Sequence, residues 1–236
     1  MDRLQKVIAN LGYCSRRKAE QLILDGKVSV NGKVIRTLGT KANYSDNIEV
    51  EGMILNKNVN KVYFLLNKPR NIICSSFDEK GRDTVVSLID TNYRIYPIGR
   101  LDYDTTGLII LTNDGDLANR LMHPKNNVPK TYLAKVEGVI DKIAIDKLKK
   151  GIIIDERKVD IIDFKIKKKD NEKKITYILI TIIEGRNHII KNIFDILGYP
   201  VIKLTRTNYS FLNIGNLKSG EYRPLTKKEI KRLYNE

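Results

Sequence analysis

The hydrophobic pattern at the start of the chain predicts two short helices. Residues 2–12 carry apolar side chains at i, i+3, i+4 and i+7, and this run stops at Gly12. Ser15 is suited to cap a second helix, which would end at Asp25-Gly26. The apolar positions that define the two core-facing stripes are Leu4, Val7, Ile8 and Leu11, followed by Ala19, Leu22 and Ile23.

A hairpin pattern follows these helices. Apolar residues alternate on both sides of Asn31-Gly32, which is a strong signal for two strands joined by a tight turn. Residues 48–50 predict one more strand. Residues 53–61 are polar and rich in Asn, so we interpret them as a linker between a first domain, 1–52, and a second, 62–236.

The second domain shows both periodicities without regular alternation of strands and helices. Segments with strand character begin at residues 62, 108, 130, 175 and 201, and helical segments lie near 117–122, 140–149 and 187–197. Thr226 and Glu229 form a capping box that predicts a last helix. Residues 167–174 suggest a basic, polar turn. This order favours an α+β fold with a mixed, mainly antiparallel sheet flanked by helices.

One polar loop, residues 98–107, leads into the apolar run 108–111, which suits a strand buried on both faces. Such a loop on a rigid sheet is a favourable place for chemistry. Asp102 is the candidate group. On the loop alone, however, the favoured interpretation is that Asp102 or Asp104 merely caps a turn, because Asp is common in turns.

Composition and charge narrow the class of protein. The 236 residues carry a net charge of +15 and are 42% hydrophobic, which indicates a folded protein with a polyanionic partner such as a nucleic acid. No apolar run reaches the ~18 residues of a membrane helix, and no signal peptide is recognisable at Met1. Cys14 and Cys74 match no metal or redox spacing, so we expect free thiols and a cytoplasmic location.

A cluster of cations marks the start of the second predicted helix. Arg16, Arg17 and Lys18 lie in its first turn, where the helix dipole is already positive. A phosphate bound there would relieve the unfavourable charge. A solvated charged helix face is the alternative, and this helix by itself does not decide between the two.

Several kinds of chemistry have no motif in this chain. There is no P-loop, dinucleotide fingerprint or serine nucleophile elbow. His123 and His188 lie far apart without a paired ligand spacing, so we expect no zinc or other metal site. If the protein is an enzyme, its reactive group is therefore a carboxylate, with Asp102 the leading candidate.

Two sets of motifs resemble known families. Leu4–Gly12, Ser15–Ala19 and Gly26–Gly32 resemble the RNA-binding domain named after ribosomal small-subunit protein four. The segment 99–115, with Gly99-Arg100-Leu101-Asp102 at its start, resembles the signature of ribosomal-RNA pseudouridine synthases of the RsuA/RluB type. Further family segments follow the expected order: Lys68-Pro69-Arg70, Lys130-Thr131-Tyr132, Glu184-Gly185-Arg186-Asn187 and Leu197–Val201.

This resemblance implies roles for individual residues. Asp102 would be the catalytic aspartate, Tyr132 would stack on the target base, and Lys191 would pair with the aspartate where the family usually has Arg. Lys lacks the planar fork of Arg, and Asn71 stands where the family usually has Gly. The expected RNA contacts are Arg16, Arg17, Lys18, Lys27, Lys68, Arg70, Arg100, Thr105, Arg186 and Asn187.

The implied activity is the conversion of a ribosomal uridine into pseudouridine. The base is flipped out, its bond to ribose is broken, and the base is rejoined through carbon, so that neither cofactor nor metal is needed. A closer likeness to the RluB branch favours large-subunit RNA, and nothing demands more than a monomer. The alternatives are a non-catalytic RNA-binding assembly factor and a glycosidase-like hydrolase that uses Asp102 with Asp104. The hydrolase is poorly supported because the chain has no Trp and few Phe for a sugar cleft.

Overall fold

The structure, a computed structural model, describes residues 1–235. Its contacts divide the chain into two compact units. The first contains Met1–Val62, Asp90–Ile95 and Thr112–Gly115, and the second contains Tyr63–Ile89, Tyr96–Leu111 and Asp116 onward. Within residues 1–235 no helix is both long and apolar enough to cross a membrane.

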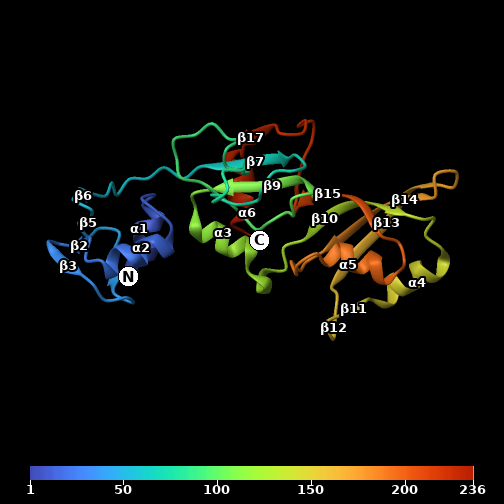
Figure 1. The fold of residues 1–236 in the computed structure, drawn as a ribbon, viewed down its shortest axis with the longest axis horizontal. Coiled ribbons are helices and arrows are strands. Elements are labelled where there is room, and N and C mark those ends of the chain that lie inside the picture. The colour runs from blue at the N-terminus through green and yellow to red at the C-terminus, as the bar shows by residue number, and fades with distance from the viewer. Residues whose placement is uncertain (236) are drawn as a thin grey trace. The chain divides into compact units, whose positions relative to one another are not determined.

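The first unit packs two helices against small antiparallel sheets (Figure 1). Helix α1 spans Leu4–Asn10 and α2 spans Arg16–Leu24, and the Ser15 side chain accepts a hydrogen bond from the Lys18 N–H, as the sequence predicts. The strands are β1 (Asp2–Arg3), β2 (Val28–Val30), β3 (Lys33–Ile35), β4 (Lys41–Ala42), β5 (Ile48–Val50) and β6 (Met53–Ile54). They form a sheet of order β3-β2-β5-β6 and a separate β1-β4 pair.

Local chemistry explains most of this unit. Asn31 and Gly32 both have positive φ, 51° and 81°, as the tight turn between β2 and β3 requires. All seven apolar positions of the two predicted helical stripes lie in or against one buried cluster with β2 and β5. One boundary differs: Met53–Ile54 pairs with β5 and Leu55 is buried, although both fall in the stretch interpreted as a linker. A two-residue edge strand is too short to show a periodicity.

The second unit is built on a nine-stranded sheet, in which seven strands follow the order β13-β14-β10-β15-β9-β7-β17, while β16 pairs with β15 and β8 with β9. Its strands are β7 (Tyr63–Lys68), β8 (Tyr96–Pro97), β9 (Thr106–Thr112), β10 (Lys130–Glu137), β13 (Ile161–Asp170), β14 (Ile175–Ile182), β15 (Val201–Tyr209), β16 (Leu212–Asn213) and β17 (Tyr222–Pro224). The pairings of β10, β14 and β17 with their neighbours are antiparallel, whereas β15 and β9 run parallel. The predicted α+β class with a mixed, mainly antiparallel sheet is confirmed.

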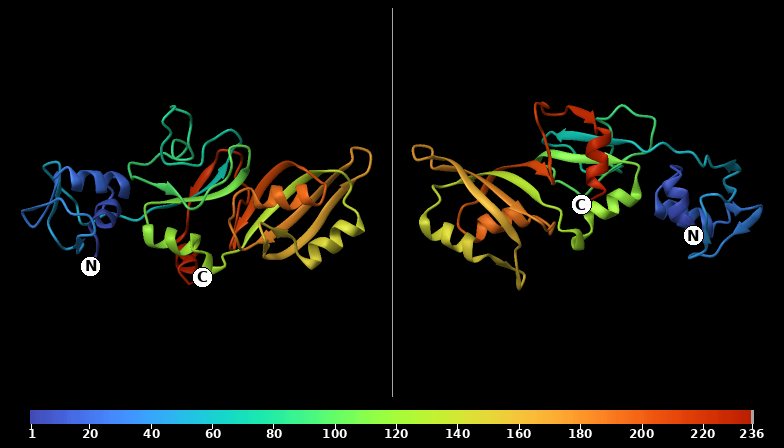
Figure 2. Two further views of the ribbon diagram at one scale, coloured as in Figure 1. Left: turned by 60° about the horizontal axis from the view of Figure 1, so that its bottom comes forward. Right: turned by 180° about the vertical axis from the view of Figure 1, so that it is seen from behind.

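Helices flank this sheet. They are α3 (Gly115–Met122), α4 (Lys142–Lys150), α5 (Ile189–Ile196) and α6 (Lys227–Leu233), with a 3-10 turn at Pro124–Asn126 and a small hairpin of β11 (Ile153–Ile154) and β12 (Arg157–Lys158). Helix α5 lies on one face of the sheet and contacts β15, the strand that follows it in the chain (Figures 1 and 2). Its apolar residues Ile190, Ile193 and Phe194 are buried, as the predicted stripe requires.

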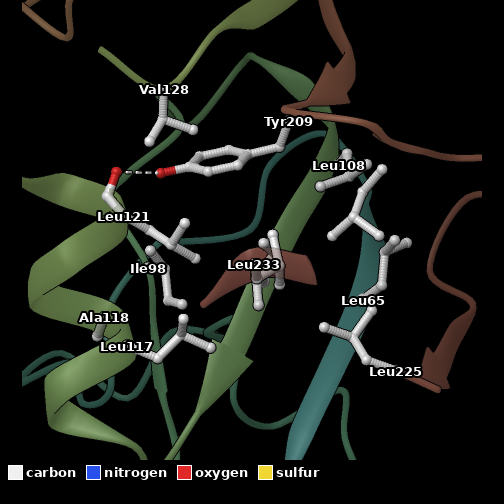
Figure 3. Packing of buried hydrophobic residues seen from close by; sticks show 12 residues of the cluster. Leu65, Ile98, Leu108, Leu117, Ala118, Leu121, Val128, Tyr209, Leu225 and Leu233 are labelled. Carbon is white, nitrogen blue, oxygen red and sulfur yellow. Dashed lines mark hydrogen bonds between the residues drawn. The ribbon is translucent and has the colours of Figure 1, made fainter. Parts of the chain in front are cut away.

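A second apolar core lies where α3 and α6 meet the strands β7 and β9 (Figure 3). Leu117 and Leu121 of α3 contribute to it together with Leu108 of β9 and Leu233 of α6. The Tyr209 hydroxyl, inside this core, donates to the Leu121 carbonyl over 2.8 Å. This core holds the end of the sheet that carries the polar loop.

One prediction for the second unit was wrong in its extent. Residues 167–174 suggested a turn because they are basic and polar, but β13 continues to Asp170 and only the residues after it turn. This strand is paired with β14 along its length and many of its side chains are exposed, so charge is tolerated on its outer positions. High polarity is therefore a poor sign of a turn at the edge of a sheet.

Candidate active site

One buried ammonium group donates hydrogen bonds to the backbone of the polar loop that precedes β9. The Lys68 Nζ, at the end of β7, donates to the carbonyl oxygens of Thr105 at 2.9 Å, Asp102 at 3.2 Å and Tyr103 at 3.4 Å. It also contacts the carbonyl of Pro69 at 3.1 Å, and Lys68 is 0% exposed. Burial lowers the pKa of Lys68. The expectation that Lys68 contacts RNA is thus wrong; its charge instead fixes the loop.

A second contact fixes the same loop from the segment after Pro69. The Asn71 N–H donates to the Tyr103 carbonyl over 2.8 Å, and Asn71 has a φ of 62°. Asn enters this left-handed region more readily than most residues, which explains how it can stand where the resembling family usually has Gly. The loop is therefore held at several carbonyl groups, and its acidic side chains are free to point elsewhere.

Two carboxylates of this loop share one lysine from α5. The Lys191 Nζ lies 3.1 Å from Asp102 Oδ2, and 2.8 and 3.1 Å from the two carboxylate oxygens of Asp104. The side chains are partly shielded: Lys191 is 21% exposed and Asp102 29%. The predicted proximity of Asp102 and Lys191 is present in the structure, together with a second carboxylate that the sequence did not place there.

The charged groups of this cluster shift the pKa values of their neighbours. Burial disfavours the charged form of Lys191, but its hydrogen bonds to Asp104 and Asp102 outweigh this and raise the pKa of Lys191. The hydrogen bond from Lys191 lowers the pKa of Asp104. Both groups are therefore charged at neutral pH, and positive charge is held against Asp102.

His188 is a further neighbour of Asp102, and it was not among the predicted site residues. Its Nδ1 lies 3.4 Å from Asp102 Oδ2, and its φ is 52°, just before α5 begins. A lone histidine near a polar turn gave no chemical signal in the sequence. His188 is the residue directly before α5, and its left-handed backbone at the start of the helix could not be read from a local pattern.

Asp102 opens onto a cavity of about 1000 Å³ within the second unit. Tyr132, on β10, lines this cavity and is 9% exposed. Thr105 and Arg206 line it as well, and each is 2% exposed. The cavity thus brings together a carboxylate, an aromatic ring and buried polar groups.

The remaining predicted RNA contacts differ in accessibility. Lys27 is exposed but forms an ion pair with Glu51 at 3.0 Å. Arg186 is bound to Glu184 and donates to the Ile154 carbonyl over 2.7 Å, so most of its guanidinium is used inside the protein. Thr105 is 2% exposed and lines the cavity, so it is not presented at the outer surface. The predicted contacts that are exposed and have no ion-pair partner among the described residues are Arg16, Arg17, Lys18, Arg70, Arg100 and Asn187.

Residues 1–235 contain no group of three or more His, Cys, Asp or Glu side chains arranged to hold a metal ion. Cys14 and Cys74 are free thiols. Cys74 lines the cavity and its Sγ lies 3.7 Å from the Gly99 carbonyl, while burial raises the pKa of this thiol. It is therefore a poor nucleophile at neutral pH.

Comparison with known proteins identifies this architecture. The family described as RNA pseudouridylate synthase matches residues 62–195, and the S4 domain matches residues 2–48. The chain belongs to the RNA pseudouridylate synthase family and is an RNA pseudouridine synthase with an N-terminal S4 domain. The resemblance drawn from the motifs is confirmed.

Individual relatives cover nearly the whole chain. It is 50% identical over 234 residues to the ribosomal large subunit pseudouridine synthase B of Bacillus subtilis strain 168, covering 99% of this chain and 96% of that protein. It is 41% identical over 235 residues to an RNA pseudouridine synthase of Aquifex aeolicus strain VF5, covering 98% and 93%. A crystal structure of a pseudouridylate synthase superposes with a TM-score of 0.68 at 31% identity, covering 99% of this chain and all of that one.

Proposed function

We propose that this protein converts a uridine of large-subunit ribosomal RNA into pseudouridine, with Asp102 as the catalytic group. The observation that carries the proposal is the contact of 3.1 Å between Asp102 and Lys191 beside a cavity that Tyr132 lines. The Bacillus subtilis relative, named for the large subunit, supports this choice of RNA. A ribosomal substrate also supports a cytoplasmic location.

The chemistry is an isomerisation, so atoms must balance within the RNA and water. The bond from ribose C1′ to N1 of uracil breaks, and a bond from C1′ to C5 forms. The proton on C5 leaves to water, and N1 gains a proton. Because the reaction consumes no other reactant, we propose that neither a metal nor a cofactor takes part. We also propose that the protein works as a monomer.

Each residue has a distinct part in this proposal. Asp102 either attacks C1′ or removes the neighbouring ribose proton, and both routes begin from its carboxylate. Lys191 holds positive charge against that carboxylate at 3.1 Å. Tyr132 stacks on the flipped base, which is worth about 1–3 kcal/mol in single-strand systems and offsets the few kcal/mol of flipping.

The first test is tritium release from large- and small-subunit ribosomal transcripts labelled at uracil C5. We expect wild-type protein to release tritium from the large-subunit RNA, and Asp102→Asn to release none while binding that RNA with similar affinity. Release by Asp102→Asn at the wild-type rate would refute the role of Asp102. Tight binding by the wild type without release would favour the RNA-binding assembly factor, and the same assay on immature ribosomal particles would then test whether the substrate is a particle.

A further inference from the structure

Two buried side-chain atoms of cavity-lining residues have no hydrogen-bond partner in the protein. Among residues 1–235, only Gln5 Oε1, Thr105 Oγ1 and Arg206 Nη2 are buried side-chain polar atoms without a hydrogen bond. Two of these three line the cavity beside Asp102. Leaving a buried polar atom unpaired is costly, so this concentration at one site points to a ligand that supplies the missing hydrogen bonds.

Strand pairing places both groups beside the residue proposed to stack on the base. Arg206 of β15 is opposite Tyr132 of β10 on one side and opposite Gly107 of β9 on the other. Thr105 lies two residues before Gly107 and donates its N–H to the Asp102 carbonyl over 3.1 Å. Side chains opposite each other in a sheet lie on the same face. Arg206 and Tyr132 therefore share one face of the sheet, and Thr105, in the loop just before β9, lines the same cavity.

The backbone fixes Arg206 tightly. Its Nε donates to the Leu108 carbonyl over 2.7 Å. A Cβ on Gly107 would lie 2.2 Å from the Arg206 carbonyl oxygen, so β15 approaches β9 as closely as only glycine allows. The guanidinium is thus anchored at Nε, while Nη2 remains for another acceptor.

The cavity wall is also cationic. The Arg206 guanidinium and the Lys130 Nζ lie over the Tyr209 ring, 5.2 and 5.5 Å from its centroid. No carboxylate in the described chain forms an ion pair with Lys130 or Arg206. Burial, and then the charge of Arg206, lower the pKa of Lys130 to about 8. Lys130 is partly buried and its Nζ donates to the carbonyls of Val128 and Ile183, whereas Arg206 is 2% exposed and has no carboxylate partner. A buried cation without a counter-charge is costly, which is expected of a site built for an electron-rich ligand.

We propose that Thr105 and Arg206 form the subsite for the polar edge of the flipped uracil, with Arg206 stabilising the negative charge of the detached base. This rests on the proposed function. Uracil offers two carbonyl acceptors and one N–H donor; a guanidinium donates to a carbonyl and a threonine hydroxyl can serve either partner. When the bond to C1′ breaks, its electron pair stays on the base by either route, so the detached base is an anion.

The charge of Arg206 can act before its hydrogen bond forms. Both Nη2 of Arg206 and Oγ1 of Thr105 are buried in this structure, so neighbouring groups must shift before the base can hydrogen-bond to either of them. The full positive charge of Arg206, which is 2% exposed, nevertheless acts over several ångströms. Thr105 contributes a local hydrogen bond and Arg206 contributes both a field and a donor.

The test compares Thr105→Val with Thr176→Val as a matched buried threonine outside the cavity. Thr176 is 0% exposed, and its hydroxyl accepts from the Ile140 N–H and donates to the Gly138 carbonyl. Single-turnover rate, RNA affinity and melting temperature are measured for both. Thr105→Val should lower the rate about tenfold with RNA affinity within about twofold and an unchanged or higher melting temperature. Thr176→Val should lower the melting temperature and keep the rate.

Arg206→Met should lower the single-turnover rate about 10²-fold or more, as loss of a charge-stabilising donor does, again with RNA affinity nearly unchanged. A wild-type single-turnover rate in Thr105→Val would overturn the subsite. So would a loss of rate in Arg206→Met that is fully explained by weaker RNA binding. A second readout does not need turnover: uridine is titrated into each protein and followed by saturation-transfer NMR.

This binding readout separates the two proposals. We expect a uridine signal from wild type and Thr176→Val, and a loss of at least tenfold in Arg206→Met. An equal signal in Arg206→Met overturns the subsite whatever the activity. Absence of tritium release by the wild type together with a signal that depends on Arg206 would instead refute the proposed function and leave the uridine subsite standing.

Discussion

Lys191 shows how one side chain can serve two acids. Its ammonium group is a compact charge with three donors, and it reaches Asp102 and both oxygens of Asp104 within 3.1 Å. The planar guanidinium of Arg favours a bidentate contact with one carboxylate. Lysine at this position therefore suits a cluster of two carboxylates, in which Asp104 helps to hold the ammonium group against Asp102.

Gly107 is the residue that most tightly constrains this site. It has a φ of 107°, and a Cβ there would lie 2.2 Å from the backbone oxygen of Arg206. We expect Gly107→Ala to destabilise the protein by about 2 kcal/mol or more, because both the backbone conformation and the strand contact are lost. Urea unfolding measures this. The control is Gly185→Ala, which has no atom within 4 Å of its Cβ and an ordinary φ; equal midpoints for the two variants would contradict the prediction.

At the scale of single elements, α6 combines a local cap with a long-range core contact. Thr226 accepts from the Glu229 N–H while Glu229 accepts from the Thr226 N–H, and Leu233 at the other end is 0% exposed. The Arg223 guanidinium donates to both oxygens of Glu229, at 2.9 and 2.7 Å. The helix therefore begins at a network of three side chains that joins it to β17.

This network makes a pH-dependent contribution to stability. Hydrogen bonds from Arg223, and then from Thr226, outweigh burial and lower the pKa of Glu229 from 4.5 to about 2. Since the pKa is lower in the folded protein, the stabilisation is complete above pH 4.5 and is lost as the pH falls towards 2. We expect Glu229→Gln to cost about 1–3 kcal/mol at pH 6. Urea unfolding from pH 3 to 7 should show this cost shrinking on acidification; a cost independent of pH would argue against the network.

Elements whose signals are local were predictable from the sequence. The Ser15 cap, the Asn31-Gly32 turn and the Thr226 capping box each depend on residues a few positions apart, and all three are present. The family resemblance also predicted that Asp102 lies near Lys191, 89 positions further along the chain. Such a resemblance carries long-range information that periodicity lacks.

The rest of the site depends on contacts between strands that no local pattern reveals. Lys68 is a cation of the kind that contacts RNA, yet it is buried under the loop and donates hydrogen bonds to four carbonyl oxygens. Arg206 lies in a strand of mixed polarity, and only the pairing of β15 with β9 and β10 places it beside Tyr132. Exposure of a basic residue is decided by the sheet register, which the sequence alone did not supply.

At the scale of the whole molecule, a net charge of +15 leads us to expect RNA affinity that falls steeply with salt. The contribution of α2 can be isolated, because Arg16, Arg17 and Lys18 are exposed in its first turn, where no acidic residue offsets the helix dipole. Replacing all three with Gln should weaken RNA binding and reduce the slope of log affinity against log salt by about 2, since each phosphate contact to a single strand contributes about 0.7.

A triple variant of α4 tests whether the effect is specific to the first turn of α2 or follows from the total positive charge of the protein. Lys147, Lys149 and Lys150 are equally exposed but lie in the last turn, where the helix dipole already favours positive charge. Their replacement with Gln removes the same charge and should leave the slope within about 0.5 of the wild-type value, as expected when no phosphate contact is lost. Filter binding between 50 and 300 mM salt supplies the slopes for all three proteins. Equal reductions of the slope in both variants would mean that RNA affinity depends on the total charge of the protein. The first turn of α2 would then not be a specific RNA-binding site.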